Sequence, residues 1–233
     1  MNGTVWVNQK CVVPRLVGVI ASPATLVRAT RLRRPPDLFE IRLDALRDSL
    51  GEVARALPRL RAPLILTARH PSEGGLGRLN AGARRALLRR FLAAATFIDL
   101  ELRSVGQMET LIDEMRRRRI GLVLSVHDFC GTPSTGELHR LAIRAAAIHP
   151  AVLKIVTRID TAAQLEQLVA FFQGANRDKL PIAAMGIGKR GAESRRWLDR
   201  LGSALTYVSL GEAKIEGQPS LGQLRRAGRA YII

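Results

Sequence analysis

Short apolar runs alternate with longer amphipathic stretches along most of this 233-residue chain, and this alternation restricts its possible folds. The runs are short and apolar throughout, as buried parallel strands are. They are Leu16–Ala21, Leu38–Leu43, Leu64–Ala68, Phe97–Leu102, Leu122–His127, Val152–Thr157, Ile182–Met185 and Leu205–Leu210. Eight strand–helix repeats in about 220 residues predict a (β/α)8 TIM barrel, with an open doubly wound sheet as the alternative.

The stretches between the runs carry apolar residues at helical spacing. The expected faces are Leu50, Val53, Ala54 and Leu57; Leu87, Leu88, Phe91 and Leu92; Met108, Leu111, Ile112 and Met115; Leu138, Leu141, Ala142 and Ala145; Leu165, Leu168, Val169 and Phe172; and Trp197, Leu198 and Leu201. The first connection, Thr25–Arg31, is the shortest. Thr4–Val13 is expected to form a small β-hairpin ahead of the barrel. Because no linker divides the sequence, we expect one domain over residues 1–233.

Composition argues against a membrane-spanning, secreted or zinc-binding protein. No apolar stretch approaches the roughly 18 residues of a membrane span, and the first residues lack the order of a signal peptide. Cys11 and Cys130 lie far apart and form neither a disulfide framework nor a zinc pattern. We therefore expect a cytoplasmic protein without a metal.

The formal net charge of +17 raises the hypothesis of a basic, non-catalytic nucleic-acid-binding protein. Most arginines, however, fall in helical segments such as Arg116 to Arg119, and aromatic residues make up only 4% of the chain. Basic and aromatic residues do not interleave as in single-strand binders. The pattern favours a solvated surface that steers anionic substrates, with nucleic acid not expected as a partner.

Polar side chains cluster at the carboxyl ends of the expected strands. They are Glu40 and Arg42, Thr67 and Arg69, Asp99 and Glu101, and Ser125 and His127, with Lys154 inside the sixth strand. Residues two apart share one side of a strand, and barrel active sites lie at this end. Since buried charges are costly unless they are paired, these residues predict one converging polar network. The alternative is that they only fill the mouth of the barrel.

Lys154 is the strongest candidate for a catalyst. Burial in a strand lowers a lysine's pKa, and nearby cations such as Arg42 or Arg69 would lower it further. A neutral amine can attack a ketone and form an iminium, which draws electrons from the adjacent carbon. The alternative is a lysine in a salt bridge with Glu40 or Glu101.

His127 follows an apolar run, so it is expected at the barrel mouth, where it could transfer protons. The alternative is a packing histidine held by a hydrogen bond. His70 is a candidate for the rim of the site, whereas His139 and His149 are expected in a helix without a functional role. No histidine has the spacing of a metal ligand.

Gly186 to Gly191 match the dinucleotide-binding pattern G-x-G-x-x-G between a strand and a helix, with Glu212 about 20 residues on. Only one further strand follows, which is too little for a nucleotide domain. In a barrel this loop commonly binds anionic groups, and Lys189 and Arg195 suit that role. We therefore expect no nicotinamide cofactor.

Seven segments in order resemble the type I 3-dehydroquinate dehydratases of the shikimate pathway. They are Phe39-Glu-Ile-Arg-Leu-Asp44, Thr67-Ala-Arg-His-Pro-Ser-Glu-Gly-Gly75, Ile98-Asp-Leu-Glu-Leu102, Ser125-Val-His-Asp-Phe129 with Thr132-Pro133, Leu153-Lys-Ile-Val156, Gly186 to Arg195, and Gly217-Gln-Pro-Ser220. Each alone is weak, but their order and spacing together are specific.

The resemblance implies a (β/α)8 barrel, commonly a homodimer, that converts 3-dehydroquinate into 3-dehydroshikimate and water without a cofactor. By the same resemblance, Lys154 forms the imine, His127 transfers the protons and Glu73 orients His127. The substrate-binding residues it implies are Glu40, Arg42, Arg69, Arg195 and Gln218.

One departure is Lys214, which stands where the family has a small hydroxyl residue. Lys214 either contacts the substrate carboxylate, or it points to solvent or pairs with Glu212 or Glu216. A Schiff-base aldolase in a similar barrel is the alternative enzyme; Glu73 with Gly74-Gly75 favours the dehydratase.

Overall fold

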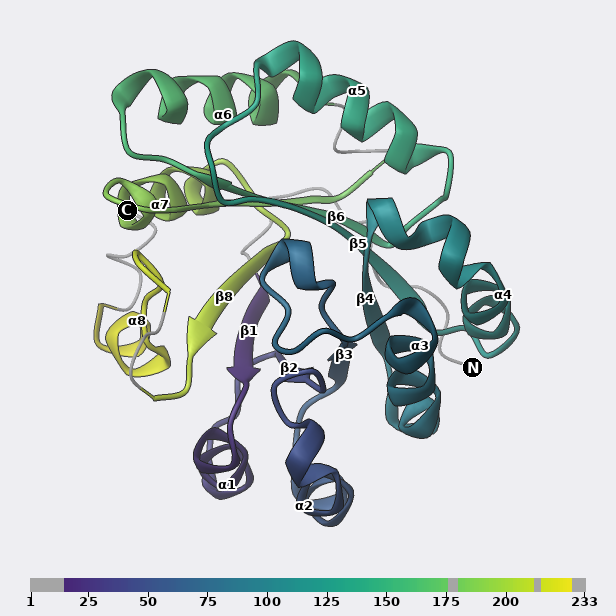
Figure 1. The fold of residues 1–233 in the computed structure, drawn as a ribbon. Coiled ribbons are helices and arrows are strands. Elements are labelled where there is room, and N and C mark those ends of the chain that lie inside the picture. The colour runs from purple at the N-terminus through teal and green to yellow at the C-terminus, as the bar shows by residue number, and fades with distance from the viewer. Residues whose placement is uncertain (1–14, 176–179, 212–214, 228–233) are drawn as a thin grey trace.

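The computed structural model describes residues 15–175, 180–211 and 215–227 and has eight parallel strands in these ranges, wound into a nearly closed barrel (Figure 1). The hydrogen-bonded order is β7-β6-β5-β4-β3-β2-β1-β8. Across the remaining seam, the Ala204 N–H donates to the Ile182 carbonyl at 2.8 Å and brings β8 to β7. The predicted (β/α)8 barrel is confirmed, and the open doubly wound sheet is wrong.

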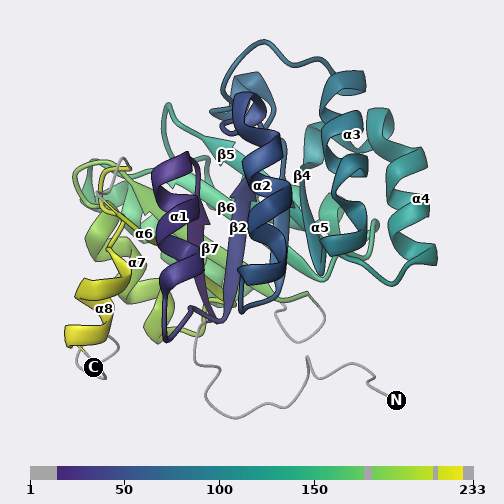
Figure 2. The same ribbon diagram turned by 90° about the horizontal axis from the view of Figure 1, so that it is seen from below.

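The strands match the eight apolar runs to within a few residues. Their bounds are β1 Arg15–Ile20, β2 Leu38–Arg42, β3 Leu64–Thr67, β4 Phe97–Glu101, β5 Gly121–Asp128, β6 Val152–Arg158, β7 Ile182–Ile187 and β8 Leu205–Ser209. The helices are α1 Pro23–Arg31, α2 Leu50–Ala56, α3 Ala81–Arg90, α4 Glu109–Arg117, α5 Thr135–Ala146, α6 Ala162–Gly174, α7 Gly191–Arg200 and α8 Leu221–Ala227. The helices lie outside the strands, and α1 and α2 lie side by side (Figure 2).

Helix starts follow from local sequence. Ser22, Ser134 and Thr161 each accept a hydrogen bond from the third helical residue, whose side chain bonds back to the cap. These capping boxes satisfy backbone donors that the first turn would leave free. Pro23 further favours the start of α1, which explains how the shortest connection still forms a helix.

Three expectations about helices are wrong. Ala54 was expected on a buried face, but it is exposed, and α2 buries Val53 and Ala56 instead. Trp197 is 47% exposed, because α7 instead buries the face that carries Ser194, Arg195 and Leu198. His149 lies beyond the end of α5, at a positive φ of 55°, rather than in a helix. The expected hairpin at Thr4–Val13 lies outside the described residues.

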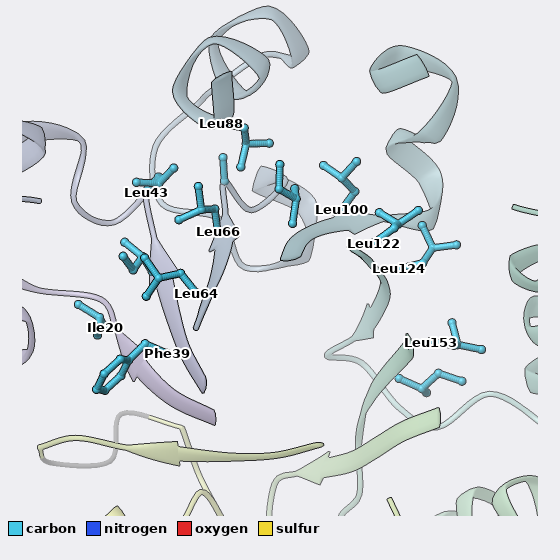
Figure 3. Packing of buried hydrophobic residues seen from close by; sticks show 14 of the residues in the cluster. Ile20, Phe39, Leu43, Leu64, Leu66, Leu88, Leu100, Leu122, Leu124 and Leu153 are labelled. Carbon is cyan, nitrogen blue, oxygen red and sulfur yellow. The ribbon is translucent and has the colours of Figure 1, made fainter. Parts of the chain in front are cut away.

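Side chains alternate along the strands between two hydrophobic clusters. One cluster contains residues from all eight strands and none from the helices, for example Val17, Phe97 and Leu205, and so fills the barrel interior. The other joins the outward faces of the strands to the helices, and Figure 3 shows part of it around Leu66 and Leu88. Within the described ranges, the helices are all too short or too polar to cross a membrane.

Arg84 is an exception to the apolar contact between helix and barrel. It projects from α3, is completely buried, and donates to the Ala68 carbonyl at 2.7 Å and to Ser104 Oγ at 3.0 Å. Its Nη2 also pairs with Glu101 at the end of β4. Arg84 therefore fixes α3 against the ends of β3 and β4 through charge and hydrogen bonding.

Substituting Arg84→Met should lower the free energy of unfolding by about 3–5 kcal/mol, because the buried Glu101 carboxylate loses a cation. Urea denaturation followed by circular dichroism measures this change. The exposed Arg55 on α2 is the control, and Arg55→Ala should change the free energy by less than about 0.5 kcal/mol. A loss below about 1 kcal/mol in Arg84→Met would show that Arg84 does not hold Glu101.

Candidate active site

A layer of polar side chains crosses the barrel near the carboxyl ends of β2 to β6. Seven of them are no more than 3% exposed: Glu40, Thr67, Arg69, Asp99, Glu101, Ser125 and Lys154. They alternate along their strands with the outward-facing apolar residues. The converging network predicted from the strand ends is therefore present.

Asp99 lies at the centre of this network. Its two carboxylate oxygens accept from both Arg69 Nη atoms, at 2.8 and 2.9 Å, and one oxygen also accepts from Ser125 Oγ at 2.6 Å. Burial alone would raise the pKa of Asp99, but Arg69 and Lys154 outweigh it and hold the pKa well below its usual range. Asp99 is thus a fixed negative charge inside the barrel.

Lys154 points from β6 to the same carboxylate. Its Nζ lies 2.5 Å from Asp99 Oδ2 and 3.7 Å from Glu40 Oε1. Glu40 is held in turn by Thr67 Oγ1 at 2.8 Å. The salt-bridge alternative was right that Lys154 has acidic neighbours, but its nearest partner is Asp99. Glu101 instead pairs with Arg69 and Arg84.

The charges of this cluster balance. Glu40, Asp99 and Glu101 supply three carboxylates, and Arg69, Arg84 and Lys154 supply three cations. Burial alone would lower the pKa of Arg69, but Asp99, Glu101 and Glu40 raise it above its ordinary value. Lys154 is the third basic group, so three basic side chains contact three acidic ones inside the barrel.

His127 and Glu73 form a pair next to this cluster. Glu73 Oε2 lies 2.9 Å from His127 Nδ1 and accepts from the His127 backbone N–H at 3.0 Å. An ionised Glu73 accepts a hydrogen bond from the Nδ1–H of His127, which leaves the lone pair on Nε2 free to take up a proton. The orienting role that the resemblance implies for Glu73 agrees with this geometry and stays a prediction.

Electrostatics keep the imidazole neutral. Burial, followed by the charges of Arg69 and Lys154, holds the pKa of His127 well below its ordinary value. Burial, together with the Glu101 carboxylate, raises the pKa of Glu73 to about 7. The pair therefore holds a neutral imidazole beside a carboxyl group that titrates near neutral pH.

Two glycines shape the loop that carries Glu73. Gly74 has a φ of 81°, in the left-handed region that side chains disfavour. A Cβ on Gly75 would lie 2.2 Å from the Arg69 carbonyl oxygen, so only glycine fits. These constraints explain why Glu-Gly-Gly is needed to turn the chain directly after β3.

Arg42 contacts the same loop. Its guanidinium binds both carboxylate oxygens of Asp44, at 3.0 and 2.8 Å, and donates to the Gly74 carbonyl at 3.0 Å. Burial opposes ionisation of Asp44, yet Arg42 and backbone donors lower its pKa. Arg42 thus joins the loops after β2 and β3 at the barrel mouth. His70 lies in this loop as well, where its Nδ1 accepts from the Ser72 N–H at 3.1 Å.

Arg195 lies at the seam between β7 and β8. It is 3% exposed, and its guanidinium donates to the carbonyls of Gly186 at 3.1 Å and Tyr207 at 3.4 Å. The G-x-G-x-x-G glycines pack α7 onto β7 here, since a Cβ on Gly186 would lie 2.4 Å from Ser194 Oγ. The motif therefore has a packing role in the barrel, and the anion binding predicted for this loop stays a prediction.

The loop after β8 carries the remaining candidates. Gln218 is half-buried, and its backbone N–H donates to the Ile215 carbonyl at 3.1 Å. Lys214 lies outside the described residues, so its two interpretations stay open. Of the other predicted site residues, Lys154, Glu40 and Arg69 share direct contacts, and His127 and Glu73 form the adjacent pair.

Sequence reasoning missed Arg84, and it gave Asp99 no role in the site. Arg84 precedes Leu88 by four residues and so shares its buried face, a pattern that could have indicated a buried cation. Asp99 was recognised as a polar strand residue, but its choice of Arg69 and Lys154 as partners depends on how the strands are aligned. In the described residues, no three acidic, histidine or cysteine side chains gather as a metal site would need.

Comparisons with known proteins agree with this geometry. The model of the family described as type I 3-dehydroquinase matches residues 22–231. A 3-dehydroquinate dehydratase of Thermococcus gammatolerans is 32% identical over 213 residues, which cover 91% of this chain and 96% of that protein. The bifunctional 3-dehydroquinate dehydratase/shikimate dehydrogenase of Arabidopsis thaliana is 29% identical over 193 residues, and the matched part spans 32% of its length.

A solved structure shares the fold. The 3-dehydroquinate dehydratase from Geobacillus kaustophilus HTA426 superimposes with a TM-score of 0.81 at 24% sequence identity. The match covers 94% of this chain and 90% of that one. At this identity the likeness supports the barrel and its order of strands.

The Glu73–His127 pair should titrate as a unit near pH 7. Above this pH, Glu73 is ionised and the imidazole is neutral with its proton at Nδ1. Below it, Glu73 takes up a proton and no longer selects that tautomer. Nitrogen NMR of the His127 ring, assigned with a His127 variant, should show the tautomer change near pH 7. An imidazolium forming with an ordinary histidine pKa would contradict the assignment.

Two variants test which group titrates. Glu73→Gln should abolish the transition near pH 7, because an amide does not ionise. Arg103 Nε lies 3.5 Å from Glu73 Oε1 and lowers the pKa of Glu73, so Arg103→Ala should move the transition to higher pH. A transition unchanged in both variants would belong to another group.

Proposed function

The chain belongs to the type I 3-dehydroquinase family, whose members are hydro-lyases, and we propose that it converts 3-dehydroquinate into 3-dehydroshikimate and water through an imine on Lys154. The observation that carries the proposal is the buried Lys154 beside Asp99, with the His127–Glu73 pair at the adjacent strand end. A basic binding protein would not need such a cluster inside the barrel. The basic surface is consistent with attraction of an anionic substrate.

Imine formation uses the Lys154 amine. The ammonium first releases a proton, and the neutral nitrogen attacks the C3 ketone to give a carbinolamine. The released proton returns to the carbinolamine hydroxyl group, which leaves as water and gives an iminium. The iminium carries the positive charge that the ammonium carried before. The carboxylates of Asp99 and Glu40, 2.5 and 3.7 Å from the amine, therefore favour both charged states.

His127 then supplies the proton transfers. Its neutral Nε2 removes a proton from C2, which the iminium acidifies, and an enamine forms. The enamine expels the C1 hydroxyl group, which takes the proton from His127 and leaves as water. The iminium forms again, and a second water molecule hydrolyses it to release the product and Lys154. Atoms and charge balance without a cofactor.

Glu40, Arg42, Arg69, Arg195 and Gln218 are proposed to bind the substrate. Arg195 supports this role because its guanidinium lies at the β7–β8 seam and could meet a carboxylate there. The evidence that Arg69 binds the substrate is less direct, since both its terminal nitrogens already bind Asp99. Arg69 would act mainly by holding Asp99 in place. The homodimer stays a prediction that rests on the resemblance, and the cytoplasmic location stays a prediction that rests on composition.

Borohydride added together with 3-dehydroquinate should inactivate the protein irreversibly and label Lys154, because it reduces an imine and leaves a salt-bridged ammonium unchanged. Peptide mass spectrometry locates the label, and ultraviolet absorbance of the conjugated product follows turnover. Lys154→Ala should lose both the label and turnover. Borohydride without substrate is the control. A label on another lysine, or on none, would overturn the imine mechanism and leave the aldolase alternative without support as well.

Replacing His127→Ala should reduce kcat by at least about 10²-fold, the scale of general acid–base catalysis. Borohydride should still label Lys154, because the amine and not the imidazole is the nucleophile. His139→Ala serves as the control: His139 packs its ring edge against Phe171, away from the cluster, and its removal should leave kcat within about twofold. Near-normal turnover in His127→Ala would exclude His127 and direct attention to His70.

A further inference from the structure

Tyr207 on β8 has a buried hydroxyl group without a partner. The residue is 4% exposed and belongs to the cluster that fills the barrel interior. Among the side chains of residues 15–175, 180–211 and 215–227, its hydroxyl is the only buried polar atom without a hydrogen bond. Such an atom is unfavourable in the substrate-free protein, because folding removes it from water without compensation.

Neighbouring hydroxyl groups on β8 do have partners. Thr206 Oγ1 donates to Asp199 Oδ1 at 2.5 Å on the outward side of the strand, and Ser209 Oγ donates to the Gly211 carbonyl at 3.0 Å. At both positions the hydroxyl group on β8 therefore has a hydrogen-bond partner within the folded protein. The isolated hydroxyl at Tyr207 stands out against this local pattern.

The ring of Tyr207 lies against the proposed nucleophile. Lys154 Nζ is 4.5 Å from the ring centroid, so any molecule bonded to Nζ must lie close to the tyrosine. Burial raises the pKa of Tyr207 well above its ordinary value, and the charges of Glu40 and Asp99 raise it further. The hydroxyl stays protonated across the physiological range and can act as a donor.

We propose that the Tyr207 hydroxyl donates a hydrogen bond to an oxygen atom of the substrate once the substrate is bonded to Lys154. This inference rests on the proposed function, which brings a carboxylate and several hydroxyl groups into the barrel. A phenylalanine would give the same contact between ring and amine, but it would lack the donor. Tyr207 thus favours oxygen-rich substrates over apolar ketones, because an apolar ketone would leave the hydroxyl unsatisfied.

Tyr207→Phe removes the donor and keeps the ring. Its kcat/KM with 3-dehydroquinate should fall about tenfold, which corresponds to the loss of one hydrogen bond. Its Tm without substrate should rise by about 2–4 °C, because an unsatisfied buried group is removed. Borohydride with substrate should still label Lys154. A merely structural hydroxyl would not produce opposite changes in stability and activity.

Thr206→Val is the matched control, since it removes a hydroxyl from the opposite side of the same strand. It should lower Tm through the loss of the bond to Asp199 and change kcat/KM by less than about twofold. If Tyr207→Phe keeps kcat/KM within twofold of the parent protein, the proposed contact is wrong. A lower Tm in Tyr207→Phe would also overturn it, by revealing a partner in the substrate-free protein. Absence of dehydratase activity in the parent protein would instead refute the proposed function.

Discussion

The buried carboxylate of Asp99 is the interaction on which the rest of the site depends. It binds Arg69 through both oxygens and Lys154 through one, and so joins the chain just after β3 to β4 and β6 inside the barrel. An isolated ion in this position would cost several kcal/mol. The shared pairing removes that cost only when the three strands keep their register, so the electrostatics and the barrel geometry support each other.

The balance of charge also has a chemical consequence. An ammonium and an iminium on Lys154 carry the same charge, so Asp99 and Glu40 serve both without rearrangement. Preorganised charges of this kind contribute to catalysis because they need no reorientation as the reaction proceeds. His127 contrasts with Lys154, because burial and the surrounding cations keep its imidazole neutral.

Sequence patterns predicted the strands and the site to different extents. The eight apolar runs predicted the barrel, because a strand that is buried on both faces is a short run of apolar residues. The i, i+2 spacing of Asp99 and Glu101 placed them together on one side of β4, but which cation each binds depends on strand register and tilt. Arg84 reaches the network from a helix, so strand patterns contained no sign of it. Trp197 fits the helical spacing of Leu198 and Leu201, but α7 buries the face with Ser194 and Arg195, and a pattern of apolar residues does not indicate a polar buried face.

Arg84 and Tyr207 are both buried near the same cluster, but Arg84 stabilises the fold, whereas Tyr207 is proposed to bind the substrate. Arg84 is fully buried, yet its guanidinium bonds to a carbonyl, a hydroxyl and a carboxylate, so its position is explained by the folded protein alone. The Tyr207 hydroxyl has no such partner in the folded protein, and the charges of Glu40 and Asp99 help to keep it protonated by raising its pKa. Proteins tend to keep locally unfavourable groups where function requires them. Among the residues that the structure describes, the buried hydroxyl of Tyr207 is the donor without a partner, and a ligand that accepts its hydrogen bond would remove this unfavourable state.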